Sequence, residues 1–356
     1  MSAEDTLARF REYMVGPARF MNLLSCFELG IVDALRETPG LTAEQLGKTA
    51  GAKPDAIEQL LHLLVKEGFV AYDEKTAGYS LDALGAVDKE DLDRALVFLD
   101  LVKITMLRQL YYFSESVRAG TVVGLKEIYG YEGTLFGAVA EHKDLRESWA
   151  VAMDVGTARV DPWFFDNIDV PKGAKVLDLA GNTGLGAINA YEHKASPGLT
   201  VTTFDLPEKE KECLENFRAH GVTEHCSFIG GDVFEKVPEG FDIVLIKHFL
   251  DMFDKNKVLQ ILSGVHSSLN TGGQVDILVP VYPEDIRNTS NVDIDFFPAF
   301  FLGCTMGQGG PQKMSTYQSW LEECGFTVTK TVTQDLAAMP PGTFVVHGIL
   351  SATKTT

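Results

Sequence analysis

Apolar residues near the N-terminus recur at the three- and four-residue spacing of an amphipathic helix. This spacing runs from Leu7 to about Leu35 and predicts one or two helices with a wide apolar face. A threonine cap at Thr42 and the sequence Lys53-Pro54-Asp55 each open a further helix. The first part of the chain is therefore expected to be helical.

Two short strands, 68–72 and 78–81, follow these helices around a polar turn. Helices followed by a small hairpin form a winged-helix pattern, for which DNA binding and dimerisation are the competing interpretations. The segment that would enter DNA, residues 55–67, carries three acids against one lysine, whereas contacts to phosphates need positive charge. The pattern favours a dimerisation domain, residues 1–105, with no nucleic-acid partner.

From Lys175 onward, strands and helices alternate, which predicts a parallel sheet with right-handed crossovers. Residues 106–165, before this sheet, are helical in pattern and rich in large side chains, and we expect them to connect the domains and cover a substrate. The last domain, 166–356, makes the fold class α/β. Its expected strands are 175–179, 199–205, 226–230, 241–247 and 274–279, with an antiparallel hairpin from 327–332 and 343–352.

Charge is the informative part of the composition. The chain of 356 residues has a formal net charge of −19 and a sequence pI near 4.8, so it would repel nucleic acid and anionic membranes. Its five cysteines include no C-x-x-C pair, which suggests neither a disulfide framework nor a metal site. The first residues do not resemble a signal peptide, and no apolar run reaches the roughly 18 residues of a membrane span. We expect a cytoplasmic protein without a membrane partner.

The candidate ligand site is the stretch 176–186, an apolar strand that ends at an acid and breaks into small residues before a helix. Such a turn lets a ligand approach the backbone, and the free N–H groups of the helix start point into the same space. Asp205, at the end of the second strand, offers two acceptors to the vicinal hydroxyls of a ribose. Neither G-x-G-x-x-G nor a G-x-x-x-x-G-K-[ST] phosphate loop is present, which favours S-adenosylmethionine over NAD.

Four segments together resemble those of a known family. Residues 178–184 resemble the D-x-G-G-G-T-G loop of class I methyltransferases, with Ala180 and Asn182 in place of two glycines. The sequences FDLP (204–207), GGDVF (230–234) and KHFL (247–250) are similar to later motifs of the small-molecule O-methyltransferases, which include plant caffeic-acid and bacterial polyketide enzymes. The resemblance implies a Rossmann-like methyltransferase sheet with a winged-helix dimerisation domain, S-adenosylmethionine as cofactor, a small-molecule substrate and a homodimer formed through the N-terminal domain.

The same resemblance implies roles for individual residues. Gly181 would approach the amino-acid part of S-adenosylmethionine, Asp205 would bind the ribose, and Asp232 and Phe234 would flank the adenine. The expected cofactor contacts are Asp178, Gly181, Asn182, Asp205, Leu206, Asp232, Val233, Phe234 and Lys247. The positions expected to meet the acceptor are Trp149, Met153, Phe296, Phe297 and Gln312.

The family's catalytic histidine and its two supporting acids are replaced by Asp251, Val279 and Gln312. Oxygen methylation benefits from a base, whose loss costs on the order of 10²-fold or more in rate. A thioether sulfur has no proton to lose and needs only positioning and desolvation. The departures therefore favour an S-methyltransferase acting on a thioether acid such as 4-methylthio-2-hydroxybutyrate, similar to enzymes on the route to dimethylsulfoniopropionate.

Two alternatives stay open. An O- or C-methyltransferase of an aromatic or polyketide natural product would use Asp251 or the nearby His248 as its base, although a lone histidine is more often structural. A protein of the same fold could also bind S-adenosylmethionine without transferring its methyl group.

Overall fold

The computed structural model describes residues 2–285, 292–335 and 345–355, with the backbone alone for 292–297. The chain divides into two compact units, Met1–Lys103 and Ile104–Thr356. A π-helical turn, η2 (Val102–Leu107), spans the boundary in sequence. Along the described part of the chain, no helix is long and apolar enough to cross a membrane.

The first unit is made of helices and a small sheet. Its helices are α1 (Ala3–Glu28), α2 (Ile31–Glu37), α3 (Ala43–Ala50), α4 (Pro54–Lys66), the 3-10 turn η1 (Ala83–Ala86) and α5 (Lys89–Leu101). Its strands are β1 (Leu41–Thr42), β2 (Val70–Asp73) and β3 (Gly78–Leu81), in the order β1-β3-β2. The expected hairpin is β2–β3, and its residues pair in antiparallel register from Val70 with Leu81 to Asp73 with Gly78.

Local sequence explains where these helices begin and end. Gly30 has φ 68°, a left-handed conformation that separates α1 from α2 within the apolar run. Thr42 caps α3 through a capping box with Gln45, as the sequence predicts, and Pro54 stands at the first turn of α4.

The N-terminal half of α1 buries little of its apolar face within its own unit. Leu7, Phe10, Tyr13 and Met14 are 60, 58, 80 and 72% exposed, whereas Leu24 and Cys26 further along the helix are buried. Four large apolar side chains exposed on one helix are more than a surface helix normally shows, which is typical of a surface covered by a partner.

The second unit begins with helices that precede the sheet. These are α6 (Arg108–Leu110), α7 (Phe113–Ala119), α8 (Val123–Tyr129), α9 (Leu135–Glu141) and the long α10 (Lys143–Asn167). The later helices are α11 (Leu185–Lys194), η3 (Pro207–Lys209), α12 (Glu210–Ala219), η4 (Leu250–Met252), α13 (Lys255–Ser268), α14 (Val292–Thr305) and α15 (Met314–Glu323).

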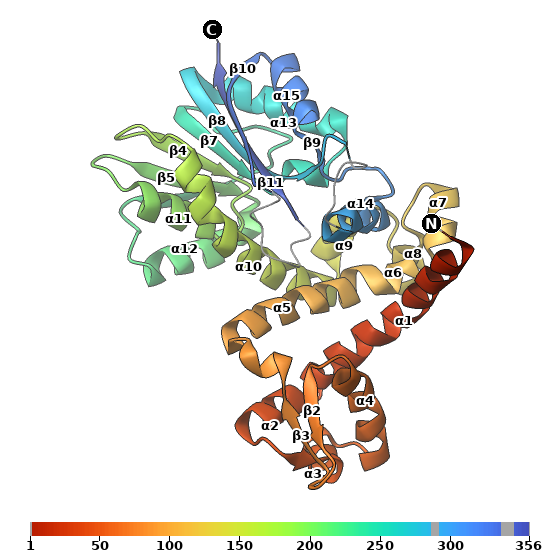
Figure 1. The fold of residues 1–356 in the computed structure, drawn as a ribbon. Coiled ribbons are helices and arrows are strands. Elements are labelled where there is room, and N and C mark those ends of the chain that lie inside the picture. The colour runs from red at the N-terminus through yellow and green to blue at the C-terminus, as the bar shows by residue number, and fades with distance from the viewer. Residues whose placement is uncertain (1, 286–291, 336–344, 356) are drawn as a thin grey trace. The chain divides into compact units, whose positions relative to one another are not determined.

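The strands of the second unit form one mixed sheet, in the order β10-β11-β8-β7-β4-β5-β6 (Figure 1). They are β4 (Lys175–Leu179), β5 (Thr200–Asp205), β6 (Cys226–Gly230), β7 (Phe241–Lys247), β8 (Leu269–Tyr282), β10 (Phe326–Thr333) and β11 (His347–Lys354), with the short β9 (Gln312–Lys313) beside β8. Strands β4 to β8 are parallel, and β10 and β11 add the antiparallel hairpin. The fold class predicted from the sequence, a Rossmann-like methyltransferase sheet, is confirmed.

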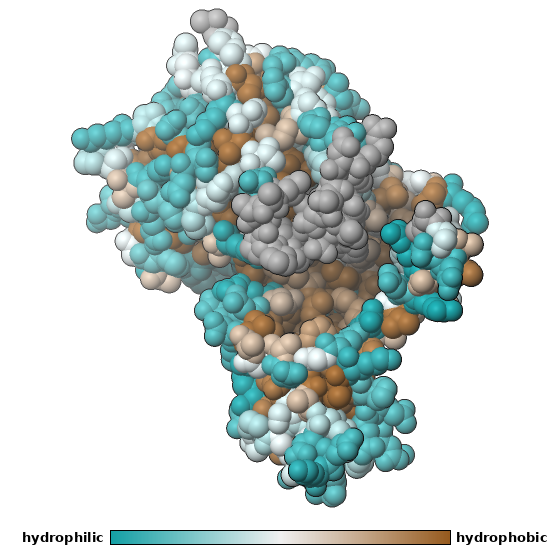
Figure 2. Space-filling view, in the orientation of Figure 1, coloured by the Kyte–Doolittle hydropathy of each residue, from teal (hydrophilic) through white to brown (hydrophobic). Residues whose placement is uncertain are grey.

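Each face of this sheet carries its own hydrophobic core because successive strand residues point to opposite sides. On β4, Leu177 and Leu179 pack in a core with α13 and α15, whereas Val176 packs in a second core with α10, α11 and α12. The outer surface of α11 and α12 is mostly hydrophilic (Figure 2). The second unit is therefore a three-layer sandwich with helices on both faces of the sheet. The carboxyl ends of the parallel strands all lie at one edge of the sheet.

Candidate active site

The loop after β4 turns sharply because three of its residues have left-handed backbone conformations. Ala180, Asn182 and Gly184 have φ values of 57°, 49° and 79°, so the two residues that replace glycines keep a glycine-like turn. The Ala180 N–H donates to the Phe204 carbonyl at 2.8 Å, and the Gly184 N–H donates to the Gly181 carbonyl at 2.9 Å. These bonds fix the loop across the ends of β4 and β5.

The glycines of this loop are required by what lies beneath it. A Cβ atom on Gly181 would contact the Asp178 carboxylate and come within 2.8 Å of Thr203 Cγ2. A Cβ on Gly186 would lie 2.5 Å from Asp178 Oδ2 and 2.9 Å from Lys247 Nζ. The loop therefore packs so closely on these groups that positions 181 and 186 have no room for a Cβ atom.

Asp205 lies where the sequence predicts, at the end of β5 beside the loop. Its Oδ2 accepts from the Asn182 N–H at 2.8 Å, and its Oδ1 accepts from the Leu206 N–H at 2.7 Å. Burial raises the pKa of this carboxyl above its ordinary value, although both N–H donors oppose that effect. Asp205, Asn182 and Leu206 thus form one hydrogen-bonded group.

Asp232, Val233 and Phe234 form the turn after β6. Asp232 Oδ1 accepts from the Phe234 N–H at 2.8 Å, and the Phe234 ring meets Phe253 edge to face at 5.2 Å between centroids. Lys257 Nζ lies 5.8 Å from the centre of the Phe234 ring. Phe234 and Val233 are half-buried against the core shared with α13.

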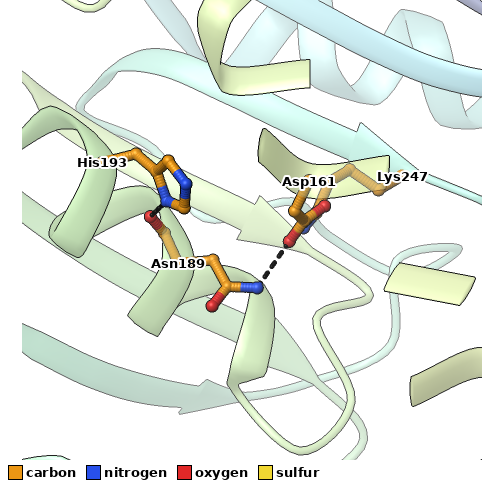
Figure 3. Close-up of polar contacts among 4 residues, drawn as sticks. All are labelled: Asp161, Asn189, His193 and Lys247. Atoms are coloured by element: carbon orange, nitrogen blue, oxygen red, sulfur yellow. Dashed lines mark hydrogen bonds and ion pairs between the residues drawn. The ribbon is translucent and has the colours of Figure 1, made fainter. Parts of the chain in front are cut away.

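Lys247, at the end of β7, is part of a polar network that sequence reasoning missed (Figure 3). Its Nζ lies 2.8 and 3.0 Å from the two carboxylate oxygens of Asp161 on α10, and Asn189 Nδ2 donates to Asp161 Oδ2 at 2.8 Å. The His193 ring hydrogen-bonds the Asn189 carbonyl at 2.9 Å. The sequence feature that could have indicated Asp161 is its position just before the aromatic residues Trp163, Phe164 and Phe165, where an acidic residue is unusual.

Asp178 is the buried acid beneath the loop. Its Oδ2 has no hydrogen-bond partner, and burial raises the pKa of its carboxyl to about 6, with Lys247 opposing the rise and Asp161 adding to it. A carboxylate oxygen that is buried without a donor is costly, so a donor is expected from a bound molecule.

The expected base position, Asp251, lies in the 3-10 turn η4 just after β7. Its carbonyl accepts from the Gly310 N–H at 2.7 Å, which holds the turn against the glycine-rich segment after α14. The Asp251 side chain is buried, its Oδ1 has no hydrogen-bond partner, and burial raises the pKa of its carboxyl to about 7. A carboxylate with such a pKa can exchange a proton at neutral pH.

His248 is half-buried and lies three positions before Asp251, but it differs in its acid–base character. Its backbone is left-handed, with φ 50°, and its N–H donates to the Leu278 carbonyl at 2.9 Å. Its ring lies 5.0 Å from that of His347, and burial lowers the pKa of His248 to about 4. The imidazole is therefore neutral at pH 7 and a weak base.

The residues expected to meet the acceptor lie on several elements. Trp149 and Met153 are half-buried on α10, and the Trp149 ring meets Phe136 edge to face at 5.5 Å. Gln312 donates from Nε2 to the Gly310 carbonyl at 3.0 Å, so it supports the segment that holds Asp251. Phe296 and Phe297 belong to α14, but their side chains lie outside the described residues.

Two family descriptions match the chain. Residues 111–327 match the O-methyltransferase domain, and residues 12–87 match the O-methyltransferase dimerisation domain. The 3-amino-4-hydroxybenzoate 4-O-methyltransferase of Streptomyces cremeus is 29% identical over 94% of this chain and 89% of its own length. The L-tyrosine C(3)-methyltransferase of Streptomyces lavendulae is 20% identical over 96% and 91%. The structure of the mitomycin 7-O-methyltransferase MmcR aligns with a TM-score of 0.80 at 20% identity, covering 98% of both chains.

Proposed function

Because this chain belongs to the O-methyltransferase family, we propose that it methylates a hydroxyl group of an aromatic small molecule, with Asp251 as the general base. The chain is an S-adenosylmethionine-dependent methyltransferase. The proposal concerns the class of acceptor and the role of Asp251.

The residues at the carboxyl edge of the sheet fit the donor. Bare backbone at Gly181, two acceptor oxygens on Asp205 and the unpartnered Oδ2 of Asp178 suit a donor whose ribose carries hydroxyls and whose amino-acid part carries an ammonium. When bound, S-adenosylmethionine supplies an electrophilic methyl group on a sulfonium. Asp205 would bind the ribose hydroxyls, and Asp232 and Phe234 would flank the adenine.

The observation that carries the proposal is the buried carboxyl of Asp251, whose Oδ1 has no hydrogen-bond partner and whose pKa is about 7. An aromatic hydroxyl becomes a strong nucleophile when its proton is removed, and a base whose pKa lies near the working pH does this most effectively. Asp251 would accept that proton as the oxygen bonds to the methyl carbon. His248, with its pKa of about 4, is too weak a base for this step.

The sulfur acceptor expected from the missing histidine gains no support from the relatives. Their names describe transfer to oxygen and carbon, and one further relative is named for transfer to nitrogen. The argument for sulfur also assumed that no base remained at position 251. A carboxyl with a pKa of about 7 removes the need for that assumption.

We also propose that the protein acts as a homodimer through residues 1–105, ahead of a helical cover, 106–165, and a catalytic domain, 166–356. Support comes from the match to a dimerisation domain and from the apolar side chains exposed on α1. Exposed apolar surface of this kind is normally covered in a stable assembly.

An acceptor panel tests the proposed reaction. The purified protein is given S-adenosylmethionine with hydroxybenzoates, including 3-amino-4-hydroxybenzoate, with an aromatic amine, or with 4-methylthio-2-hydroxybutyrate. S-adenosylhomocysteine release and product mass are measured. We expect methyl ethers of phenolic acceptors. Turnover of the thioether alone would establish sulfur as the acceptor, and donor binding without any product would indicate a non-methylating protein.

A further inference from the structure

We propose that Asp161 is a positioning residue for the methyl donor: by holding the Lys247 ammonium, it keeps one oxygen of Asp178 available for the α-ammonium group of S-adenosylmethionine. This inference rests on the use of that donor. It assigns a function to an ion pair that the transfer step itself does not use.

The Lys247 ammonium forms a bidentate ion pair with Asp161. Both carboxylate oxygens lie within hydrogen-bond distance, at 2.8 and 3.0 Å, and the two side chains are 9% and 1% exposed. Asn189 Nδ2 adds a third hydrogen bond to the same carboxylate, at 2.8 Å from Oδ2 (Figure 3). An ion pair that is buried and supported by a further hydrogen bond holds its geometry.

Asp178 lies beside this pair without joining it. A Cβ atom added to Gly186 would be 2.5 Å from Asp178 Oδ2 and 2.9 Å from Lys247 Nζ. The carboxylate and the ammonium therefore both lie next to the Gly186 backbone. Asp178 Oδ2 nevertheless has no hydrogen-bond partner and is buried. Lys247 therefore sits close enough to compete for Asp178 but is held by Asp161.

The charged groups around Asp178 carry a surplus of negative charge. Asp178 faces Lys247 from β7, Asp161 from α10 and Asp205 from β5, and Cys213 and Cys226 also lie within electrostatic reach. One ammonium thus stands among three carboxyls, and the surplus negative charge beneath the loop suits a positively charged ligand group. The α-ammonium of the donor is such a group.

Removal of the Asp161 charge should redirect Lys247. In Asp161→Asn, the Lys247 ammonium loses its carboxylate partner. We expect it to pair with Asp178 instead, because a buried charge without an opposite charge is strongly destabilising. The donor's ammonium then meets an occupied carboxylate. Loss of one charge-assisted hydrogen bond corresponds to roughly 10- to 100-fold weaker binding.

The test compares two ligands by calorimetry. S-adenosylhomocysteine carries the α-ammonium, and 5′-methylthioadenosine shares the adenosine and sulfur but lacks the amino-acid part. In Asp161→Asn, we expect the Kd of S-adenosylhomocysteine to rise roughly 10- to 100-fold and that of 5′-methylthioadenosine to stay within about twofold. Asp166→Asn, at an exposed position of the same helix, is the control and should change neither.

A second variant separates positioning from simple structural support. In Asp161→Asn/Lys247→Met, no ammonium is left to occupy Asp178, so S-adenosylhomocysteine affinity should return toward that of the wild type. The double variant also leaves no buried ammonium without a carboxylate partner, which keeps the test available if the single variant folds poorly.

The pH dependence gives a third readout. Wild-type affinity for S-adenosylhomocysteine should rise as pH passes through about 6, where Asp178 ionises, because only the carboxylate attracts the ammonium. In Asp161→Asn, the Lys247 charge lowers the pKa of Asp178, so the rise should move to lower pH.

Equal losses for both ligands, or no recovery in the double variant, would overturn the proposal and leave Asp161 a purely structural residue. If the wild-type protein bound neither ligand, the use of this donor would itself be wrong, which is a distinguishable outcome.

Discussion

Replacement of Asp251 by asparagine tests the proposed base most directly, because the amide keeps the shape of the carboxyl but cannot take up a proton. The side chain is 6% exposed, so little space opens for water to replace it. General-base catalysis typically contributes ~10²- to 10⁴-fold, and we expect Asp251→Asn to lower kcat by about 10² or more. The Kd of S-adenosylhomocysteine should not change.

The pH profile adds a quantitative check. With a pKa of about 7 on Asp251, the ionised fraction rises roughly tenfold between pH 6 and pH 8, and wild-type kcat/KM should rise with it. The residual rate of Asp251→Asn should lack this rise. A base at His248, with its pKa of about 4, would instead give a rate that is level across this range.

Stability should move in the opposite direction to activity. The pKa of Asp251 is raised in the folded protein from 3.8 to about 7, so the carboxyl opposes folding most above pH 7, where it is ionised in both states. Well below pH 3.8 it is protonated in both states and this effect vanishes. The asparagine variant should therefore gain up to about 4 kcal/mol at pH 8 and roughly 2 kcal/mol at pH 5.

Urea unfolding monitored by tryptophan fluorescence measures this gain, since Trp149, Trp163 and Trp320 all lie in the second unit. Initial rates of S-adenosylhomocysteine formation on a phenolic acceptor give the activity. Unchanged kcat in Asp251→Asn would refute the assignment of the base. A stability gain that was the same at pH 5 and pH 8 would refute the raised pKa.

Three further predictions concern the donor loop and the N-terminal unit. Asp205→Asn removes a charged acceptor at the ribose position and should raise the Kd of S-adenosylhomocysteine about 10- to 100-fold by calorimetry, with an unchanged value arguing against this contact. Gly186→Ala places a Cβ 2.5 Å from Asp178 Oδ2 and should lower the free energy of unfolding by about 1–3 kcal/mol; unaltered urea unfolding would contradict this packing. Phe10→Asp, on the exposed face of α1, should shift the protein from dimer to monomer in sedimentation velocity, whereas a persistent dimer would place the interface elsewhere.

The parallel strands could be predicted closely because their sequences are short apolar runs bounded by turn residues. Lys175–Leu179, Cys226–Gly230 and Phe241–Lys247 have the predicted bounds. Strand β8 is longer than expected, since it begins at Leu269 rather than Gln274. Residues 270–273 are polar or glycine, which hides the start of the strand, yet Leu269 pairs with Phe241 through the backbone.

The candidate site was predictable where a motif places its residues at the end of one strand. Asp178 is the last residue but one of β4, and Asp205 and Lys247 end β5 and β7, in the positions that their motifs indicate. Asp161 was missed because it acts through Lys247, 86 positions further along the chain, and an acid within a helix carries no signal of a distant partner. The pKa of Asp251 was equally hidden, because it depends on burial in the folded chain.

Helix α10 also bears on how new acceptors can arise within this architecture. Met153 and Asp161 lie on the same helix, about 12 Å apart along its axis, so the residue expected to meet the acceptor is about two turns from the residue proposed to position the donor. Substitutions in the N-terminal half of α10 can therefore change the acceptor site without disturbing the Asp161–Lys247 ion pair in the C-terminal half. A directed-evolution library should therefore vary positions 149 and 153 and retain Asp161.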